Sequence, residues 1–210
     1  MGLRESFQAG LARQLGHPSG LRGRVVGAML NRRNRAAVVK AVAALELSGT
    51  ETALDIGFGG GLGLELMLRQ AAAVHGVDIS AAMLARALSG FGDEIAAGRL
   101  RLHEGSMTAL TLDDDAVEAI VSTNTIYFVD DLGAAFSEVA RVLAPGGRFV
   151  LGIGDPDLMG RSKMLTGNGF RIRPVDEVKT ALGTAGLPVT RHEQFSHSGL
   201  GFHLLISGPQ

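Results

Sequence analysis

From Thr52 onward, apolar runs of the length of a β-strand alternate with stretches of helical periodicity. The predicted strands cover residues 52–56, 73–77, 99–103, 116–122 and 147–153, and the predicted helices cover residues 62–70, 80–90 and 131–143. Strands and helices that alternate through short loops form right-handed βαβ units, in which the strands run parallel. The order of elements therefore predicts a doubly wound α/β fold.

The C-terminal part of the chain breaks this alternation. A predicted helix at 174–185 precedes two strands, 188–195 and 200–207, which only Ser196-His197-Ser198-Gly199 separates. Such a short link between two strands indicates an antiparallel hairpin. We therefore expect a mostly parallel, seven-stranded sheet that ends in an antiparallel hairpin.

Residues 3–47 have helical periodicity, which Gly16-His17-Pro18-Ser19-Gly20 interrupts. The second part, residues 34–47, is predicted to be an amphipathic helix. No composition shift or linker marks a second domain. We expect a single domain over residues 1–210, with N-terminal helices at 1–47 and an α/β core at 48–210.

Composition excludes several classes of site. The chain has no cysteine, so disulfides, thiolate metal sites and cysteine nucleophiles are ruled out. Its six histidines show no metal-ligand spacing, and we expect no metal. The formal net charge of −1 gives no overall reason to expect nucleic acid or membrane as a partner. Without an export signal or an apolar run of about 18 residues, a cytoplasmic location is expected.

The most informative stretch is Asp55-Ile56-Gly57-Phe58-Gly59-Gly60-Gly61, where a strand runs into a glycine loop before a helix. Glycine lets the backbone turn sharply and approach a ligand closely. The strict dinucleotide fingerprint needs glycine three residues after Gly59, where this chain has Leu62. Asp55 would also repel a pyrophosphate, whereas it suits a ligand with a cationic amino group and no phosphate.

Asp78 is the second indication of a ligand. It ends the second predicted strand, and an acid in this place accepts hydrogen bonds from both hydroxyls of a ribose. Ile79 follows and is able to pack on the face of an adenine ring. S-adenosylmethionine is a ligand of this kind: it is a nucleoside whose tail carries a cationic amino group and no phosphate.

These residues resemble the class I S-adenosylmethionine-dependent methyltransferases, and in particular the small-molecule enzymes similar to the ubiquinone-biosynthesis type. Four segments carry the resemblance: Asp55 to Gly61; Gly76 to Ser80 with Met83; Glu104-Gly105-Ser106; and Arg141 to Phe149. Ser106 departs from the aspartate that is usual at its position. The resemblance implies a Rossmann-like fold, S-adenosyl-L-methionine as cofactor, and cofactor contacts by Asp55, Gly57, Phe58, Gly59, Gly61, Asp78, Ile79, Met83, Ser106, Met107 and Asn124.

The loop after the fourth predicted strand, Ser122 to Phe128, lies where this family meets the methionine end of the cofactor and the acceptor. Asn124 offers a donor and an acceptor there, and Tyr127 is a candidate for substrate contact or for the core. His17, in the N-terminal break, is a further substrate candidate. Methyl transfer from a sulfonium needs little acid–base equipment, and we assign no catalytic residue.

The first 40 residues hold eight basic side chains and one acid. Three interpretations stay open for residues 1–47: a lid that holds an anionic small substrate, a nucleic-acid or membrane contact, or a solvated helical face. The favoured function is methyl transfer to a small molecule by a monomer or homodimer. The alternatives are RNA methylation and cofactor binding without methyltransferase activity.

Overall fold

The computed structural model describes residues 34–161 and 170–209. The sheet strands are β1 (Thr52–Ile56), β2 (Ala73–Asp78), β3 (Leu100–Glu104), β4 (Val117–Thr123), β5 (Leu143–Gly154), β6 (Val189–His197) and β7 (Leu200–Ser207). The helices are α3 (Leu62–Leu68), α4 (Ala81–Gly90), α5 (Gly92–Ala96), α6 (Leu132–Val142), α7 (Pro156–Gly160), α9 (Val175–Thr184) and the 3₁₀ turn η1 (Ile126–Phe128). Residues 34–43 are also helical.

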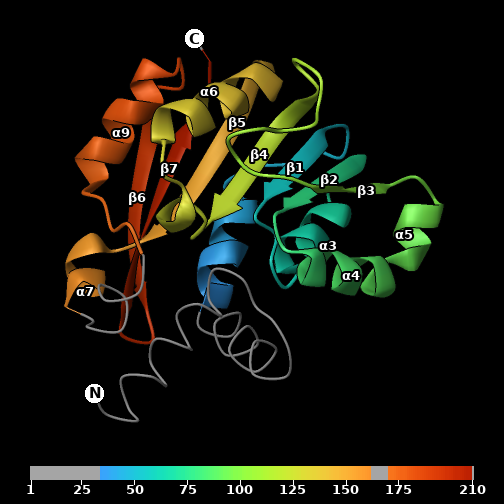
Figure 1. Cartoon of the computed structure of the whole chain (residues 1–210), viewed down its shortest axis with the longest axis horizontal. Helices are drawn as coiled ribbons and strands as arrows, with labels where there is room; N and C mark the ends of the chain where they lie inside the picture. Colours follow the sequence, from blue (N-terminus) through green and yellow to red (C-terminus); the bar gives the residue numbers. More distant parts are fainter. Residues whose placement is uncertain (1–33, 162–169, 210) are drawn as a thin grey trace.

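The seven strands form one sheet in the order β3-β2-β1-β4-β5-β7-β6 (Figure 1). β1 to β5 pair in parallel, whereas β7 runs antiparallel to both β5 and β6. The predicted doubly wound, mostly parallel sheet with a terminal hairpin is confirmed. Because the first five strands are parallel, the loops that follow them meet at one edge of the sheet, where ligands bind in such folds.

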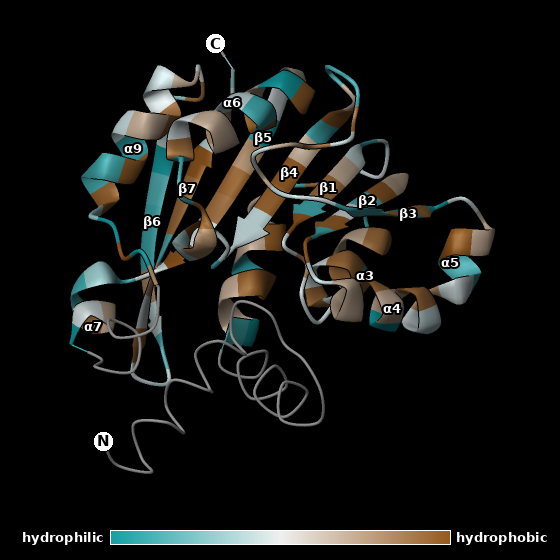
Figure 2. Cartoon of the chain, in the orientation of Figure 1, coloured by the Kyte–Doolittle hydropathy of each residue, from teal (hydrophilic) through white to brown (hydrophobic). Residues whose placement is uncertain are grey.

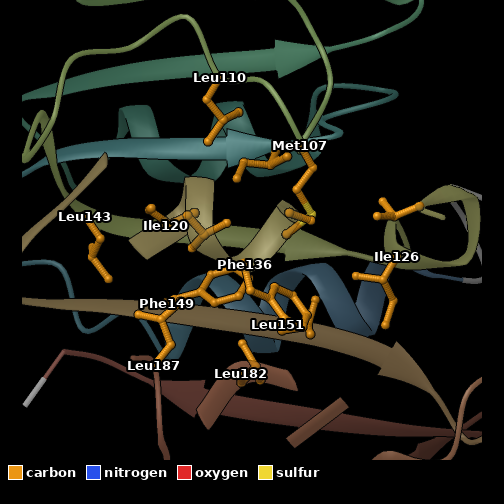
Figure 3. Packing of buried hydrophobic residues seen from close by; sticks show 14 of the residues in the cluster. Met107, Leu110, Ile120, Ile126, Phe136, Leu143, Phe149, Leu151, Leu182 and Leu187 are labelled. Carbon is orange, nitrogen blue, oxygen red and sulfur yellow. The ribbon is translucent and has the colours of Figure 1, made fainter. Parts of the chain in front are cut away.

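The side chains of the central strands alternate between two hydrophobic cores, one on each face of the sheet. In β5, Phe149 and Leu151 belong to one core and Val150 to the other. The first core is covered by α6 and α9, and Figure 3 shows Phe136 and Leu182 packed near Phe149 and Leu151. The rings of Phe136 and Phe149 lie 6.3 Å apart, centre to centre.

The opposite core is covered by α3, α4 and the helix at 34–43. The inner strands of the sheet are largely hydrophobic, and appear brown in Figure 2. Leu64 and Met67 of α3 are fully buried here. Val42 and Leu45 are buried in the same core. A lid that extends to residue 47, one of the three interpretations of this segment, does not fit the burial of Ala41, Val42, Ala44 and Leu45 in the core. Residues 1–33, with His17, lie outside the described residues.

Two short helices and the start of β5 were not predicted. β5 begins at Leu143, directly after α6, and its pairing with β4 shifts register between Val117 and Ala119. The shift lets the strand pass through Pro145 and Gly146, which the sequence suggested as a loop. α7 begins because the side chain of Asp155 accepts a hydrogen bond from the Leu158 amide, which caps the helix.

Within the described ranges, no helix combines the length and the apolar character that crossing a membrane requires.

Candidate functional site

The glycine loop lies at the carboxyl end of β1. Gly57, Gly59 and Gly61 all have positive φ, at 74°, 49° and 83°. The Gly57 amide donates to the Val77 carbonyl at 2.7 Å, which ties the start of the loop to β2. These left-handed conformations are strained for other residues, so the sequence needs glycine here to turn from β1 into α3.

The loop is also held from β4, by hydroxyls that sequence reasoning missed. Ser122 and Thr125 donate to the Ile56 carbonyl at 2.9 and 3.2 Å. A Cβ on Gly57 would lie only 2.4 Å from the Thr125 hydroxyl oxygen. The run of hydroxyl residues from Ser122 to Thr125 was the available signal, but it does not reveal which carbonyl the hydroxyls bind.

Asp78 braces the opposite side of the glycine loop. One of its carboxylate oxygens accepts from the Gly59 amide at 2.8 Å, and the other accepts from the Ser80 amide at 2.9 Å. The side chain is nearly buried, at 7% exposure. The carboxylate therefore holds the glycine loop against the end of β2.

Asp55 is a nearly buried carboxylate at the end of β1, 5% exposed, beneath the first turn of α3. A Cβ on Gly63 would lie 2.1 Å from its oxygen, so the helix approaches closely only because that residue is glycine. No hydrogen bond or ion pair compensates this carboxylate within residues 34–161 and 170–209. Burial, together with the nearby charge of Asp78, raises the pKa of Asp55 to about 8.

Three other predicted residues lie near the same edge. Ile79 follows Asp78 with 56% of its surface exposed, which is unusual for a large apolar side chain. Met83 lies on the following helix, α4, and is half-buried. The Ser106 hydroxyl, after β3, is 2.9 Å from the Thr108 hydroxyl, which satisfies part of its hydrogen-bonding capacity.

Phe58 and Met107 lie with their side chains in the cores rather than at the edge. Phe58 is 5% exposed and Met107 is 3% exposed. Figure 3 shows Met107 among the apolar side chains of the core covered by α6. Both residues stay predicted cofactor contacts, with their side chains buried in the cores.

The loop after β4 contains Asn124 and Tyr127. Asn124 has a positive φ of 57°, and its amide donates to the Gly152 carbonyl at 2.8 Å. Tyr127 is 4% exposed, and burial raises the pKa of its hydroxyl. Phe128, the next residue, is 44% exposed. Tyr127 was a candidate either for substrate contact or for the core, and its burial favours the core.

Arg173, which lies just before α9 in the chain, was not singled out from the sequence. It nevertheless holds the loop after β4 through hydrogen bonds. Its guanidinium donates to the carbonyls of Ile126 and Val129 at 2.9 and 2.7 Å. Only 11% of its side chain is exposed. An arginine that satisfies several backbone carbonyls fixes a loop that has little regular structure of its own.

Four of the described histidines form two hydrogen-bonded pairs. His75 and His103 approach to 2.9 Å between ring nitrogens, and so do His192 and His203. Burial, then His103 and Arg101, lower the pKa of His75 to about 4, so that it is neutral at physiological pH. Among the residues whose positions are described, no group of three or more metal-ligating side chains occurs.

Residues 54–151 match the sequence family described as Methyltransferase domain. The chain is 27% identical over 187 residues to the Biotin biosynthesis bifunctional protein BioHC of Teredinibacter turnerae, over 76% of this chain and 33% of that protein. It is 36% identical over 99 residues to the Ubiquinone/menaquinone biosynthesis C-methyltransferase UbiE of Methylobacterium nodulans, over 47% of this chain and 39% of that protein. The chain thus spans well under half the length of these two curated relatives.

The fold also occurs in solved structures. Geranyl diphosphate C-methyltransferase from Streptomyces coelicolor A3(2), determined in complex with Mg²⁺, geranyl diphosphate and S-adenosyl-L-homocysteine, superposes with a TM-score of 0.73 at 21% identity. The match covers 94% of this chain and 86% of that one. Over residues 54–151 the chain thus matches a methyltransferase domain, and its fold is shared with the geranyl diphosphate C-methyltransferase.

Proposed function

We propose that this protein transfers the methyl group of S-adenosylmethionine to a small-molecule acceptor. The observation that carries the proposal is the pair of nearly buried carboxylates, Asp55 and Asp78, on either side of a glycine loop. A cofactor with a phosphate would add negative charge beside both carboxylates, which is unfavourable. An amino-acid ammonium would compensate Asp55, and ribose hydroxyls would donate to the Asp78 carboxylate.

When bound, S-adenosylmethionine supplies a methyl group that the positive charge on sulfur already activates. The protein's part is to hold donor and acceptor in line and to exclude water. In the proposed arrangement, Asp78 binds the ribose, Ile79 covers the adenine, and Asp55 faces the ammonium. Gly57, Gly59 and Gly61 bring the backbone close to the cofactor without an intervening side chain.

Several observations support a small acceptor. The names of the two curated relatives place them in the biosynthesis of biotin and of ubiquinone and menaquinone. The near-neutral charge of −1 lacks the strongly basic balance that is typical of RNA-binding proteins. Eight basic residues against one acid among the first 40 support an anionic acceptor that the N-terminal segment helps to hold.

The purified protein is expected to bind S-adenosylhomocysteine and not NAD, because Asp55 and Leu62 disfavour a pyrophosphate. Titration calorimetry with both ligands measures this. Methyl transfer is tested by incubating the protein with a metabolite extract and methyl-labelled S-adenosylmethionine and measuring which metabolite gains the label. Binding of NAD without binding of S-adenosylhomocysteine would refute the cofactor assignment.

Replacing Asp78 by Ala is expected to weaken S-adenosylhomocysteine binding tenfold or more. Hydrogen bonds to a charged group contribute about 1.5–3 kcal/mol each, and about 1.4 kcal/mol corresponds to a factor of ten. The variant also leaves the amides of Gly59 and Ser80 without their acceptor. Calorimetry compares it with Asp113→Ala, which removes an exposed carboxylate from the loop before β4. Equal dissociation constants for Asp78→Ala and the wild type would show that Asp78 only caps its strand.

A further inference from the structure

Asn124 is held in one orientation at the carboxyl end of β4. Its backbone takes a left-handed conformation, with φ at 57°, and its amide is fixed to the Gly152 carbonyl of β5. The side-chain oxygen Oδ1 accepts a hydrogen bond from the hydroxyl of Tyr127, over 3.3 Å. Both the main chain and the side chain of Asn124 therefore have defined partners at the carboxyl edge of the sheet.

The hydroxyl of Tyr127 determines which end of the Asn124 amide faces it. The Gly154 amide donates to this hydroxyl oxygen at 2.6 Å. A phenol has a single hydrogen to donate, and in the described residues the Tyr127 hydroxyl donates it to Oδ1 of Asn124. A donor must face an acceptor, so Oδ1 points at Tyr127 and the –NH₂ group of the amide points away from it. Burial keeps this hydroxyl protonated by raising the pKa of Tyr127.

The –NH₂ group of Asn124 is left as an accessible donor. It has no hydrogen-bond partner within the described ranges, and it is not among the buried unpartnered side-chain atoms there. β4 pairs directly with β1, where Ile56 is opposite Ser122. The edge thus presents an uncompensated carboxylate on β1, Asp55, and an uncompensated amide donor just after β4, Asn124.

These two groups prefer opposite partners. Asp55 attracts an ammonium, and the Asn124 –NH₂ group attracts a carboxylate oxygen. An α-amino acid carries both on one carbon, as does the methionine end of the cofactor.

We propose that Tyr127 is a positioning residue that fixes the Asn124 amide so that its –NH₂ group binds the carboxylate of the cofactor's amino-acid end. The inference deepens the proposed function and rests on it. Tyr127 touches neither the cofactor nor the acceptor. Its hydroxyl acts through Asn124 alone, and the amide of Gly154 sets the direction in which that hydroxyl donates.

The test compares S-adenosylhomocysteine with 5′-methylthioadenosine, which has the same nucleoside and sulfur but lacks the amino-acid end. Tyr127→Phe is expected to weaken S-adenosylhomocysteine binding about tenfold and to change 5′-methylthioadenosine binding less than about twofold. Calorimetry with both ligands gives the ratio. Thr190→Val is the control, because it removes a hydroxyl that donates to the Ile206 carbonyl, in strands remote from the glycine loop.

Asn124→Asp tests the polarity of the contact. It keeps the shape of the side chain and an oxygen for Tyr127, but it replaces the donor by a negative charge. S-adenosylhomocysteine binding is expected to fall further than in Tyr127→Phe, again without loss of 5′-methylthioadenosine binding. Stronger binding by Asn124→Asp would mean that this side chain meets the ammonium, and the inference would be wrong.

The remaining outcomes also decide. Equal weakening of both ligands by Tyr127→Phe would show that Tyr127 only supports the fold, and unchanged binding of both would show that Asn124 needs no support. If Tyr127→Phe does not fold, the binding of the two ligands by Asn124→Asp tests the inference instead. A wild-type protein that binds neither ligand would refute the proposed function itself, whereas binding of both with no difference between variants would refute only the role of Tyr127.

Discussion

Replacing Asp55 by Asn is expected to stabilise the cofactor-free protein at alkaline pH and to weaken cofactor binding. Burial and the charge of Asp78 raise the pKa of Asp55 from 3.8 to about 8. The folded state thus binds this proton more tightly than the unfolded state, and the wild type loses stability as the pH rises between these two values. Each pKa unit corresponds to about 1.4 kcal/mol, so the loss reaches several kcal/mol. Asparagine avoids this cost because it does not ionise.

Urea unfolding of the cofactor-free proteins at about pH 5, 7 and 9 measures this effect. The difference in unfolding free energy between Asp55→Asn and the wild type should grow with pH. Asp113→Asn, which neutralises an exposed carboxyl, should keep the pH dependence of the wild type. A parallel pH dependence in Asp55→Asn would show that the Asp55 carboxyl is not held as described.

The same substitution should weaken S-adenosylhomocysteine binding tenfold or more, because the ammonium loses its charged partner. At neutral pH the wild-type carboxyl must release a proton to pair with the ammonium. Calorimetry in buffers with different ionisation enthalpies detects that proton, and it should be absent in Asp55→Asn. Asp55 is therefore expected to lower the stability of the free protein in exchange for affinity.

Replacing Gly57 by Ala is expected to abolish measurable S-adenosylhomocysteine binding and to destabilise the fold. The new Cβ would lie 2.4 Å from Oγ1 and 2.9 Å from Cγ2 of Thr125. Thr125 cannot move without losing its hydrogen bond to the Ile56 carbonyl. The positive φ of 74° adds a strain of about 1–2 kcal/mol for a residue with a side chain.

Gly98→Ala separates the two causes. Gly98 has a similar φ of 70°, but a Cβ there meets no atom within 4 Å. Its replacement should cost only the conformational strain and leave cofactor binding intact. Urea unfolding and calorimetry on both variants give the comparison. If Gly57→Ala behaves as Gly98→Ala does, the close approach of Thr125 to the loop is not important.

The alternation of apolar runs was sufficient to predict most of the fold. The strand at 52–56 was predicted with the bounds that β1 has, and β2, β3 and β4 were placed within one residue. These strands are short, and β1, β2 and β4 are largely buried, so local signals agree with tertiary packing. The start of β5 was missed because Pro145 and Gly146 resemble a loop, and only the register shift beside β4 lets the strand contain them.

The site was only partly predictable. Motif spacing indicated which loops meet, because the carboxyl ends of parallel strands share an edge. Spacing does not give the direction of a side chain, so it did not reveal that the side chains of Phe58 and Met107, two predicted cofactor contacts, lie in the cores. The bond between Tyr127 and Asn124 depends on Gly154, 27 residues away in sequence, which no local pattern reveals.

The position of β7 has a consequence for how the polypeptide emerges during synthesis. β6 is made before β7, yet among the strands of the described residues it pairs with β7 alone. Until residues 200–207 leave the ribosome, the edge of β5 is open to a wrong partner, and β6 is the segment nearest in the chain. β6 is largely hydrophilic (Figure 2), and it carries Arg191 and Glu193, whereas β7 is buried along most of its length. Charged strands make poor partners for a buried edge. The polar side chains of β6 therefore disfavour its pairing with β5, so that β7, which is translated later, pairs with β5 instead.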